Sequence, residues 1–329
     1  MSAPPESLVP LLRKVMTGQD LTAAEAEEGF HLIMAGGASP LRVAGLLGAL
    51  QGKGLAPAEV AGGVRALRRA MVAVDRRGKD VVDTCGTGGG SVSTFNISTA
   101  SAFVAAAGGV AVAKHGNRSF TSRSGSADVL EALGVAIEGT PEELSEVLER
   151  VGLVFMFAPL FHPAMRHVGP VRRELGVTTI MNLLGPLTNP ALARRQVVGV
   201  AEASLLPLLA DALAQLGHER ALVVHGAPGM DEVSPCGPTQ VAEVMNGSVR
   251  TYDVAPQDFG FEPVDPDALA GGEPADNATI IRAVLEGAER GAPRTAVVLN
   301  AAAAFYVGGR SNSLHDGVRD AEDAIDSGA

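Results

Sequence analysis

The hydrophobic pattern divides the chain into a helical first part and a longer part in which strands and helices alternate. Up to about residue 70, apolar positions recur with the period of a helix, and no strand-like run occurs. Thr22 and Glu25 have the spacing of a capping box, which predicts a helix that ends near Gly36. Ser39-Pro40 predicts the start of another helix, and a further helix is expected over residues 57–71.

From Asp80 onward, short runs rich in Val and Ile alternate with helical segments. The expected strands are 80–84, 110–114, 153–157, 196–201, 220–225 and 294–299. The expected helices are 98–107, 126–134, 141–151, 205–216, 277–288 and 314–326. Such alternation predicts a mostly parallel sheet with helices on both faces. Asn246-Gly247 predicts a type I′ hairpin between 239–245 and 248–254, which adds antiparallel strands at one edge.

Residues 159–182 interrupt this alternation with short helices that resemble those of the N-terminal part. We therefore expect two domains. The first is a small all-helical N-terminal domain of residues 1–72, joined by 160–182. The second is a larger α/β domain of residues 73–329, in which helices flank a mostly parallel central sheet.

Composition narrows the class of protein. The 329 residues are 46% apolar, enough for a large core, and the net charge of -11 argues against a nucleic-acid binder with a basic face. The two cysteines, Cys85 and Cys236, give neither a disulfide framework nor zinc spacing. The N-terminus lacks the regions of a signal peptide, and apolar runs of membrane-spanning length are absent. We expect a cytoplasmic protein that binds neither membrane nor nucleic acid.

A glycine-rich loop, Gly86–Gly90, follows an expected strand and precedes the start of a helix at 96–99. Glycine allows close approach of the backbone to a ligand, and helix N-termini attract anions. The loop differs from the phosphate loop of nucleotide hydrolases, because no Lys-Ser or Lys-Thr pair follows. It also differs from the dinucleotide fingerprint, because no acidic residue ends the next strand. This context favours anion binding over a simple turn.

A second polar loop, Lys114–Ser126, follows the next strand. Lys114 and Arg118 supply positive charge, and arginine can bind a phosphate with two hydrogen bonds. The neutral polar groups of this loop are Asn117, Thr121, Ser122 and Ser126. Two such loops in tandem predict a sugar that carries more than one phosphate. His115 has two open roles, proton transfer or orientation of the loop.

The adjacent carboxylates Asp231-Glu232 follow the expected strand 220–225. Carboxylates at the end of a strand suit Mg²⁺, which takes oxygen ligands and pairs with substrate phosphates. A solvated acidic turn is the alternative, and the two phosphate-binding loops favour the metal. No partner near Cys85 forms a nucleophilic triad, so we interpret this thiol as a packing residue.

These motifs resemble anthranilate phosphoribosyltransferase, an enzyme of tryptophan biosynthesis. The matching stretches, in the family's order and spacing, are Gly86–Thr99, Lys114–Gly134, Phe157–Pro190 and His225–Val233. The helical N-terminal part fits the family as well. The resemblance implies that the amine of anthranilate attacks C1 of 5-phosphoribosyl-1-pyrophosphate, which gives N-(5′-phosphoribosyl)anthranilate and pyrophosphate.

The resemblance also implies functional residues. The metal ligands for Mg²⁺ would be Ser98, Asp231 and Glu232, and anthranilate would contact Gly86, Asn117 and Arg172. The residues implied for phosphoribosyl pyrophosphate are Gly86, Gly89, Gly90, Thr94, Asn96, Ile97, Ser98, Thr99, Lys114, His115, Gly116, Asn117, Arg118, Ser119, Phe120, Thr121, Ser122 and Ser126. Lys114 and His115 are the candidate catalytic residues. The family further suggests a homodimer through the helical domain and a site in the cleft between the domains.

The chain departs from the family at one position. The family's first loop usually ends Gly-Thr-Gly-Gly-Asp, whereas residue 90 is glycine here. This removes a carboxylate beside the expected pyrophosphate site, so we expect altered affinity for metal and pyrophosphate with unchanged chemistry.

Two alternatives remain at this stage. A pyrimidine nucleoside phosphorylase has a related loop but needs no Mg²⁺ on pyrophosphate, and Asp231-Glu232 with 182–190 favours the transferase. A catalytically silent relative that binds nucleic acid would need a basic surface, which the net charge of -11 opposes.

Overall fold

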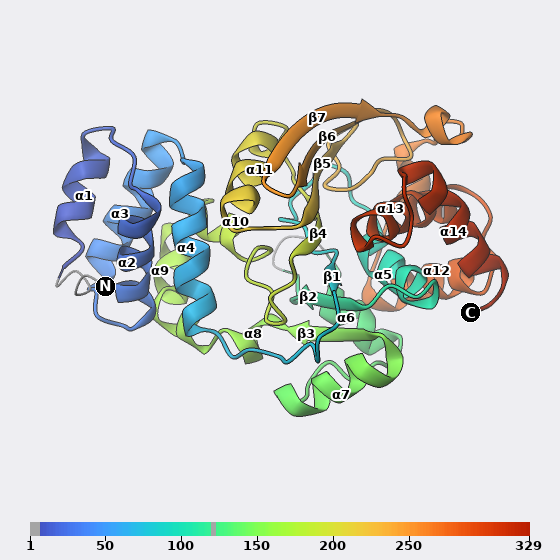
Figure 1. The fold of residues 1–329 in the computed structure, drawn as a ribbon, viewed down its shortest axis with the longest axis horizontal. Helices are drawn as coiled ribbons and strands as arrows, with labels where there is room; N and C mark the ends of the chain where they lie inside the picture. The colour runs from blue at the N-terminus through green and yellow to red at the C-terminus, as the bar shows by residue number, and fades with distance from the viewer. Residues whose placement is uncertain (1–6, 120–122) are drawn as a thin grey trace.

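The computed structural model describes residues 7–119 and 123–329, and it begins with a bundle of four helices at one end of the molecule (Figure 1). These are α1 (Val9–Met16), α2 (Ala23–Met34), α3 (Pro40–Lys53) and α4 (Pro57–Ala70). The expected capping box is present, because Thr22 Oγ1 accepts from the Glu25 N–H and the Glu25 carboxylate accepts from the Thr22 N–H. Among the described residues, no helix is long and apolar enough to cross a membrane.

Short helices follow the third strand, and those from residue 163 onward pack back onto this bundle. They are α8 (Ala158–Phe161), the 3₁₀ helix η1 (Pro163–His167), α9 (Gly169–Leu175) and α10 (Ile180–Leu184). Val171 of α9 and Ile180 of α10 belong to the same buried cluster as Phe30 of α2 and Leu46 of α3. The domain boundaries at 72 and 73 stay a prediction.

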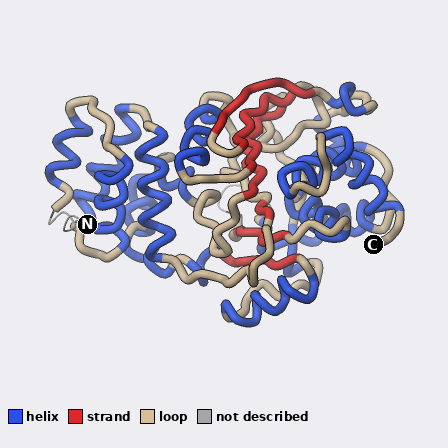
Figure 2. Tube along the Cα trace, viewed as in Figure 1, coloured by secondary structure: helices blue, strands red, loops and turns tan. Residues whose placement is uncertain are grey.

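Strands are red in Figure 2, and among the described residues the central sheet has seven of them in the order β3-β2-β1-β4-β5-β6-β7. Their bounds are β1 (Val82–Asp83), β2 (Val112–Gly116), β3 (Leu153–Phe157), β4 (Arg195–Gly199), β5 (Arg220–Gly226), β6 (Thr239–Met245) and β7 (Ser248–Val254). Strands β1 to β5 pair in parallel, whereas β6 and β7 pair antiparallel. The mostly parallel sheet that the sequence predicts is confirmed.

The predicted hairpin at Asn246-Gly247 is also confirmed. Met245 pairs with Ser248, and the two turn residues have φ of 48° and 84°. Positive φ at both central positions is the requirement of a type I′ turn, which Asn-Gly meets at low cost.

Helices cover both faces of the sheet. Neighbouring residues of one strand, such as Leu222 and Val223 of β5, contribute to different buried clusters. One cluster lies under α5 (Ile97–Ala107), α12 (Pro274–Leu285), α13 (Ala292–Gly308) and α14 (Leu314–Asp326). The other lies under α11 (Leu205–Gln215) and the helical bundle. The remaining elements are α6 (Ser126–Ala132), α7 (Pro141–Val151), η2 (Pro256–Phe259) and η3 (Pro266–Leu269).

The strand predicted over 294–299 is wrong, because these residues form the middle of α13. Val297, Val298 and Leu299 are all buried, as are the alanines that follow them. A helix that is buried on all sides has no polar face, so its apolar run lacks the helical period and resembles a buried strand.

Candidate functional site

A small polar cavity lies where the parallel strands end. It is lined by Thr84 and Gly86 after β1, by Ser98 in the first turn of α5, and by Asp231 and Glu232 after β5. Its volume is about 40 Å³, enough for an ion or a water molecule but not for a sugar phosphate. The first glycine-rich loop, the helix start and the acidic pair are thus brought together, as ligand sites at the carboxyl ends of strands require.

The loop Gly86–Gly90 lies tightly against the neighbouring strand. A Cβ at Gly86 would lie 2.9 Å from the carbonyl oxygen of Gly199, and the Thr87 N–H donates to the same oxygen at 2.8 Å. Gly88 and Gly89 have φ of 69° and 86°, which residues with side chains rarely adopt. The sequence of this loop is therefore dictated by close packing and by backbone conformation.

Gly90 lies against the acidic pair. A Cβ added at Gly90 would lie 2.9 Å from Oδ1 of Asp231 and 3.0 Å from the carbonyl oxygen of Gly229. The absent family carboxylate would therefore lie directly beside Asp231.

The two residues of the acidic pair are half-buried. Burial raises the pKa of Asp231 above its ordinary value, and burial together with the neighbouring Asp231 carboxylate raises the pKa of Glu232 well above its ordinary value. Glu232 Oε2 is buried without a hydrogen-bond partner among the described residues. Two incompletely compensated carboxylates beside a hydroxyl fit the oxygen ligands that Mg²⁺ prefers. A solvated acidic turn does not describe them.

The metal would need further ligands. Within 7–119 and 123–329, no three His, Cys, Asp or Glu side chains are grouped so that they could hold a metal ion. A site of two carboxylates is typical of Mg²⁺ that is also bound by substrate phosphates.

Lys114 is the buried cation of the site. Its side chain comes from the middle of β2, and the residue is 3% exposed. Nζ donates to the carbonyl oxygen of Thr84 at 3.1 Å, to Thr84 Oγ1 at 3.1 Å and to Ser98 Oγ at 3.3 Å. Among the described residues, no carboxylate oxygen lies within 4.0 Å of Nζ. A buried ammonium with only neutral partners favours an anionic ligand nearby.

His115 follows Lys114 and contacts a second histidine. Its Nε2 lies 3.2 Å from Nε2 of His162, so the proton of one ring points to the lone pair of the other. Burial, and then the nearby His162, lower the pKa of His115 to about 3, and burial lowers the pKa of His162 to about 4. Both rings are neutral at neutral pH.

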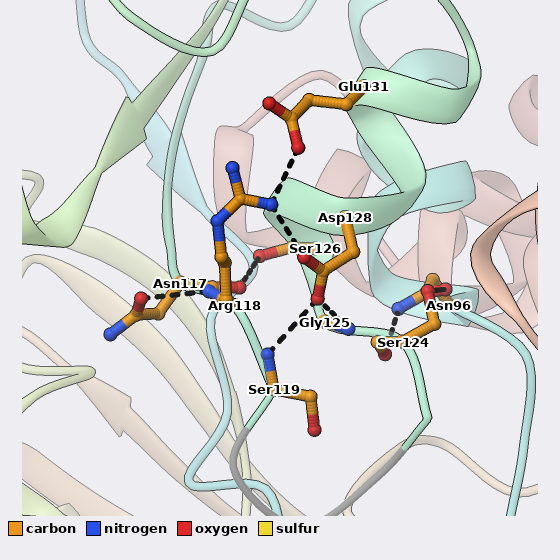
Figure 3. A network of polar contacts seen from close by, with 9 residues as sticks. All are labelled: Asn96, Asn117, Arg118, Ser119, Ser124, Gly125, Ser126, Asp128 and Glu131. Atoms are coloured by element: carbon orange, nitrogen blue, oxygen red, sulfur yellow. Dashed lines mark hydrogen bonds and ion pairs between the residues drawn. The ribbon is translucent and has the colours of Figure 1, made fainter.

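Arg118 joins the described part of the second loop to α6 (Figure 3). Its guanidinium donates to Asp128 Oδ1 at 2.8 Å and to Glu131 Oε2 at 2.6 Å, both on α6. Asn117 Oδ1 accepts from the Arg118 N–H, and Ser126 Oγ donates to the carbonyl oxygen of Asn117. The charge of Arg118 is thus compensated by two carboxylates, and its contact with phosphoribosyl pyrophosphate stays a prediction.

Other predicted residues are distributed around the two loops. Asn96 joins them, because its side chain is hydrogen-bonded to Ser124 of the second loop (Figure 3). The side chain of Asn96 also accepts from Asn277 of α12. Thr94 pairs with Ala270, and Ile97 and Thr99 are buried. Gly116 ends β2, and Ser119 N donates to Asp128. Phe120, Thr121 and Ser122 lie outside the described residues.

Arg172 lies on α9, the helix that packs on the bundle rather than on the sheet. The side chain is half-buried, and burial lowers its pKa. Within the described part of the chain it has no ion-pair partner. It is a partly desolvated cation that can receive an anionic group.

Sequence reasoning missed the buried polar residues beneath the site. Asp83 accepts from the His115 N–H at 3.1 Å, and Asn189 Nδ2 donates to the other oxygen of Asp83 at 2.7 Å. Both side chains are completely buried. A charged residue and an amide residue inside apolar segments near strand ends could have indicated these positions. Asp83 and Asn189 are 106 positions apart, however, so no local pattern predicts that they pair.

Comparisons with known proteins agree with this arrangement. Residues 9–71 match the helical bundle domain of a glycosyl transferase family, and residues 78–329 match the α/β domain of that family. The anthranilate phosphoribosyltransferase of Rubrobacter xylanophilus is 56% identical over 97% of this chain and 93% of that protein.

Solved structures give the same result. The anthranilate phosphoribosyltransferase of Thermus thermophilus has a TM-score of 0.91 at 48% identity, over 96% of this chain and 94% of that one. The Saccharomyces cerevisiae enzyme in complex with PRPP and Mg has a TM-score of 0.87 at 27% identity, over 98% of this chain and 94% of that one.

Proposed function

Because the chain belongs to the anthranilate phosphoribosyltransferase family, we propose that the strand-end cavity and the two glycine-containing loops form its active site. The chain is a transferase that moves the 5-phosphoribosyl group from phosphoribosyl pyrophosphate to the amine of anthranilate. The products are N-(5′-phosphoribosyl)anthranilate and pyrophosphate, and the reaction is a step of L-tryptophan biosynthesis.

The observation that carries the site assignment is the buried ammonium of Lys114. Its hydrogen-bond partners are the neutral oxygens of Thr84 and Ser98, so no carboxylate is bonded directly to the ammonium, although Asp83 and Glu232 lie close enough for its charge to oppose the rise that burial causes in their pKa. As pyrophosphate leaves, negative charge develops on it, and a positioned cation stabilises that charge in the transition state. Backbone N–H groups of Gly86–Gly90, apart from that of Thr87, which donates to Gly199, and of the start of α5 would supply further donors.

Ser98, Asp231 and Glu232 would hold Mg²⁺. The unpartnered Glu232 Oε2 and the cavity of about 40 Å³ support this assignment, since a cavity of that size has room for an ion. The bound ion would neutralise part of the pyrophosphate charge. The S. cerevisiae relative solved with PRPP and Mg is consistent with one such cofactor.

Gly86, Asn117 and Arg172 would contact anthranilate. Arg172 is a half-buried cation without an ion-pair partner in the described chain, which suits the carboxylate of anthranilate. The amine of anthranilate is a neutral and weakly basic nucleophile, so holding it at C1 contributes more than a strong base. His115 orients the site in this account, because a ring with a pKa of about 3 is a weak proton acceptor.

The substrates need more space than the small cavity provides. Phosphoribosyl pyrophosphate would extend from the strand ends toward α9, so that α/β residues contact its phosphates and bundle residues contact anthranilate. Movement of the two parts toward each other would exclude water during the reaction.

A homodimer through the helical bundle would complete the assembly, in a cytoplasmic enzyme. Met16 of α1 is 72% exposed and Leu41 of α3 is 86% exposed, which is unusual for large apolar side chains. Gly48 and Gly52 of α3 have no atoms within 4 Å of an added Cβ, so another helix could approach closely. Light scattering of Leu41→Asp tests this: loss of the dimer supports the proposal, and an unchanged mass contradicts it.

The direct test of function mixes purified protein with anthranilate, phosphoribosyl pyrophosphate and Mg²⁺ and follows the loss of anthranilate fluorescence. We expect a metal-dependent loss that a chelator and Lys114→Ala both abolish. The matched control is Lys79→Ala, which removes a lysine of the linker after α4 and should leave the rate unchanged. No loss at high enzyme concentration would contradict the proposal.

A further inference from the structure

A continuous line of contacts joins the helical bundle to the backbone of β2, the strand that carries Lys114 and His115. It consists of hydrogen bonds and of the chain between Leu187 and Asn189. It begins at Arg68 of α4, whose Nε and Nη2 donate to the carbonyl oxygen of Leu187 at 3.1 and 2.8 Å. Leu187 lies in segment 185–191, between α10 and β4. Arg68 is half-buried, and burial lowers its pKa to about 10. Among the described residues, the hydrogen-bond acceptor of its guanidinium is the Leu187 carbonyl.

The segment 185–191 then contacts the sheet through Asn189. Its Nδ2 donates to Asp83 Oδ2 at 2.7 Å and to the carbonyl oxygen of Ala113 at 2.8 Å, while its Oδ1 accepts from the Ala191 N–H at 2.8 Å. Both N–H groups of this buried amide and its oxygen are therefore hydrogen-bonded, which ties the segment to β1 and β2. The next residue, Pro190, also accepts from the Val74 N–H in the linker after α4.

Asp83 joins Asn189 to the backbone of β2. Its Oδ1 accepts from the His115 N–H at 3.1 Å, and its carboxylate lies close enough to the Lys114 charge for that charge to oppose the effect of burial on the Asp83 pKa. Gln196 Nε2 supports the same carboxylate at 3.5 Å. A carboxylate held mainly by the Asn189 amide, with a longer contact from Gln196, thus fixes the backbone between Lys114 and His115.

We propose that Asp83 and Asn189 are positioning residues that couple the location of the helical bundle to the location of the Lys114–His115 backbone. The inference rests on the proposed function, because Lys114 binds the phosphates and α9 of the bundle carries Arg172. When the bundle moves toward the sheet with anthranilate, the Leu187 carbonyl moves with Arg68, and Asn189 and Asp83 carry that movement to β2. Phosphate binding and anthranilate binding are thereby linked.

A double-mutant cycle between Arg68 and Asp83 tests the coupling, because neither side chain bonds the other. Asp83→Asn and Arg68→Met should each lower kcat/KM by about 10- to 100-fold, as expected for loss of a charged hydrogen bond. If the line transmits movement, the double variant loses little more than Asp83→Asn alone. If the two effects multiply to within about twofold, the proposal is overturned.

Arg65 offers a matched control on the same helix. Its Nη2 donates to the carbonyl oxygen of Gln215 on α11, so it also joins the bundle to the α/β part but outside the line. Arg65→Met and Asp83→Asn should have effects that multiply. A second check exchanges the two side chains. The double variant Asp83→Asn with Asn189→Asp re-forms an amide–carboxylate bond and should recover part of the kcat/KM that Asp83→Asn loses.

Hydrogen exchange separates this inference from the proposed function, because it needs no substrate. Arg68→Met should speed exchange of the amides of β2, including that of His115, whereas Arg65→Met should leave them unchanged. Where Arg68→Met fails to fold, Arg68→Lys keeps the charge but loses the paired donors, and the same result is expected. Unchanged exchange in β2 would overturn the coupling even in an active enzyme.

Discussion

The Nζ atom of Lys114 lies 3.3 Å from Oγ of Ser98, which joins the buried cation on β2 to the residue that also lines the acidic cavity at the start of α5. The same ammonium donates to the carbonyl oxygen and to Oγ1 of Thr84, which precedes the glycine-rich loop. One side chain therefore connects the elements that we propose to bind phosphate with those that we propose to bind the metal.

Removal of a metal ligand should change the dependence on Mg²⁺. Glu232→Gln keeps the size of the side chain but removes the charge, so we expect the Mg²⁺ concentration that gives half-maximal activity to rise at least about tenfold. Glu202→Gln alters an exposed acid after β4 and serves as the control. Equal Mg²⁺ titrations of wild type and Glu232→Gln would refute the assignment.

Restoring the family acid should act on the same titration. Gly90→Asp would place a carboxylate beside Asp231, since even the added Cβ lies 2.9 Å from Asp231 Oδ1. The extra negative charge should lower the half-maximal Mg²⁺ concentration several-fold. Gly90→Ala adds the same Cβ without the charge and separates crowding from electrostatics. Identical metal dependence of Gly90→Asp and Gly90→Ala would rule out the electrostatic effect.

The kcat of a His115 variant tests whether this residue transfers a proton. Because burial and the neighbouring His162 lower its pKa to about 3, His115 is a poor general base at neutral pH. His115→Asn retains a hydrogen-bonding group, and we expect kcat to stay within about tenfold of wild type. A loss of about 10²- to 10⁴-fold, typical of a missing proton acceptor, would restore the proton-transfer role.

The histidine pair should also make stability depend on pH. In the unfolded chain both rings bind a proton near their ordinary pKa of 6.5, whereas in the folded protein they do so only near 3 and 4. The unfolded state thus binds more protons below pH 6.5, and stability that is complete above this pH is lost as the pH falls toward 4. The slope is about 1.4 kcal/mol per pH unit for each histidine.

Denaturant unfolding at a series of pH values measures this slope. His162→Gln removes one of the two buried rings and should flatten the loss of stability between pH 6.5 and 4. His315→Gln removes an exposed histidine and is the control. A slope in His162→Gln as steep as in wild type would show that the pair does not cause the acid sensitivity.

Local patterns predicted much of the fold. The Asn246-Gly247 turn and the capping box at Thr22 depend on residues that are adjacent in sequence, and both form as expected. Part of α13 was wrongly predicted as a strand. Its apolar run reflects burial on all sides, which only the assembled core provides.

The site was predictable as a set of motifs but not as a network. Lys114 and the acidic pair were singled out through loops that follow strands, which is a local signal, whereas Ser98 was named as a metal ligand only through the family resemblance. The pairing of Arg118 with Asp128 and Glu131, and that of Asp83 with Asn189, depends on how α6 and segment 185–191 fold back. Such contacts between distant positions leave no periodicity in one sequence.

The most direct test of the account is calorimetric binding of phosphoribosyl pyrophosphate with Mg²⁺, without anthranilate, to wild type and to Lys114→Ala. The buried ammonium is the central claim, and loss of its charged contacts should raise the Kd by about 10- to 100-fold, while Lys79→Ala leaves the Kd unchanged. An unaltered Kd in Lys114→Ala, with the fold intact, would contradict the assignment of this lysine to the phosphates.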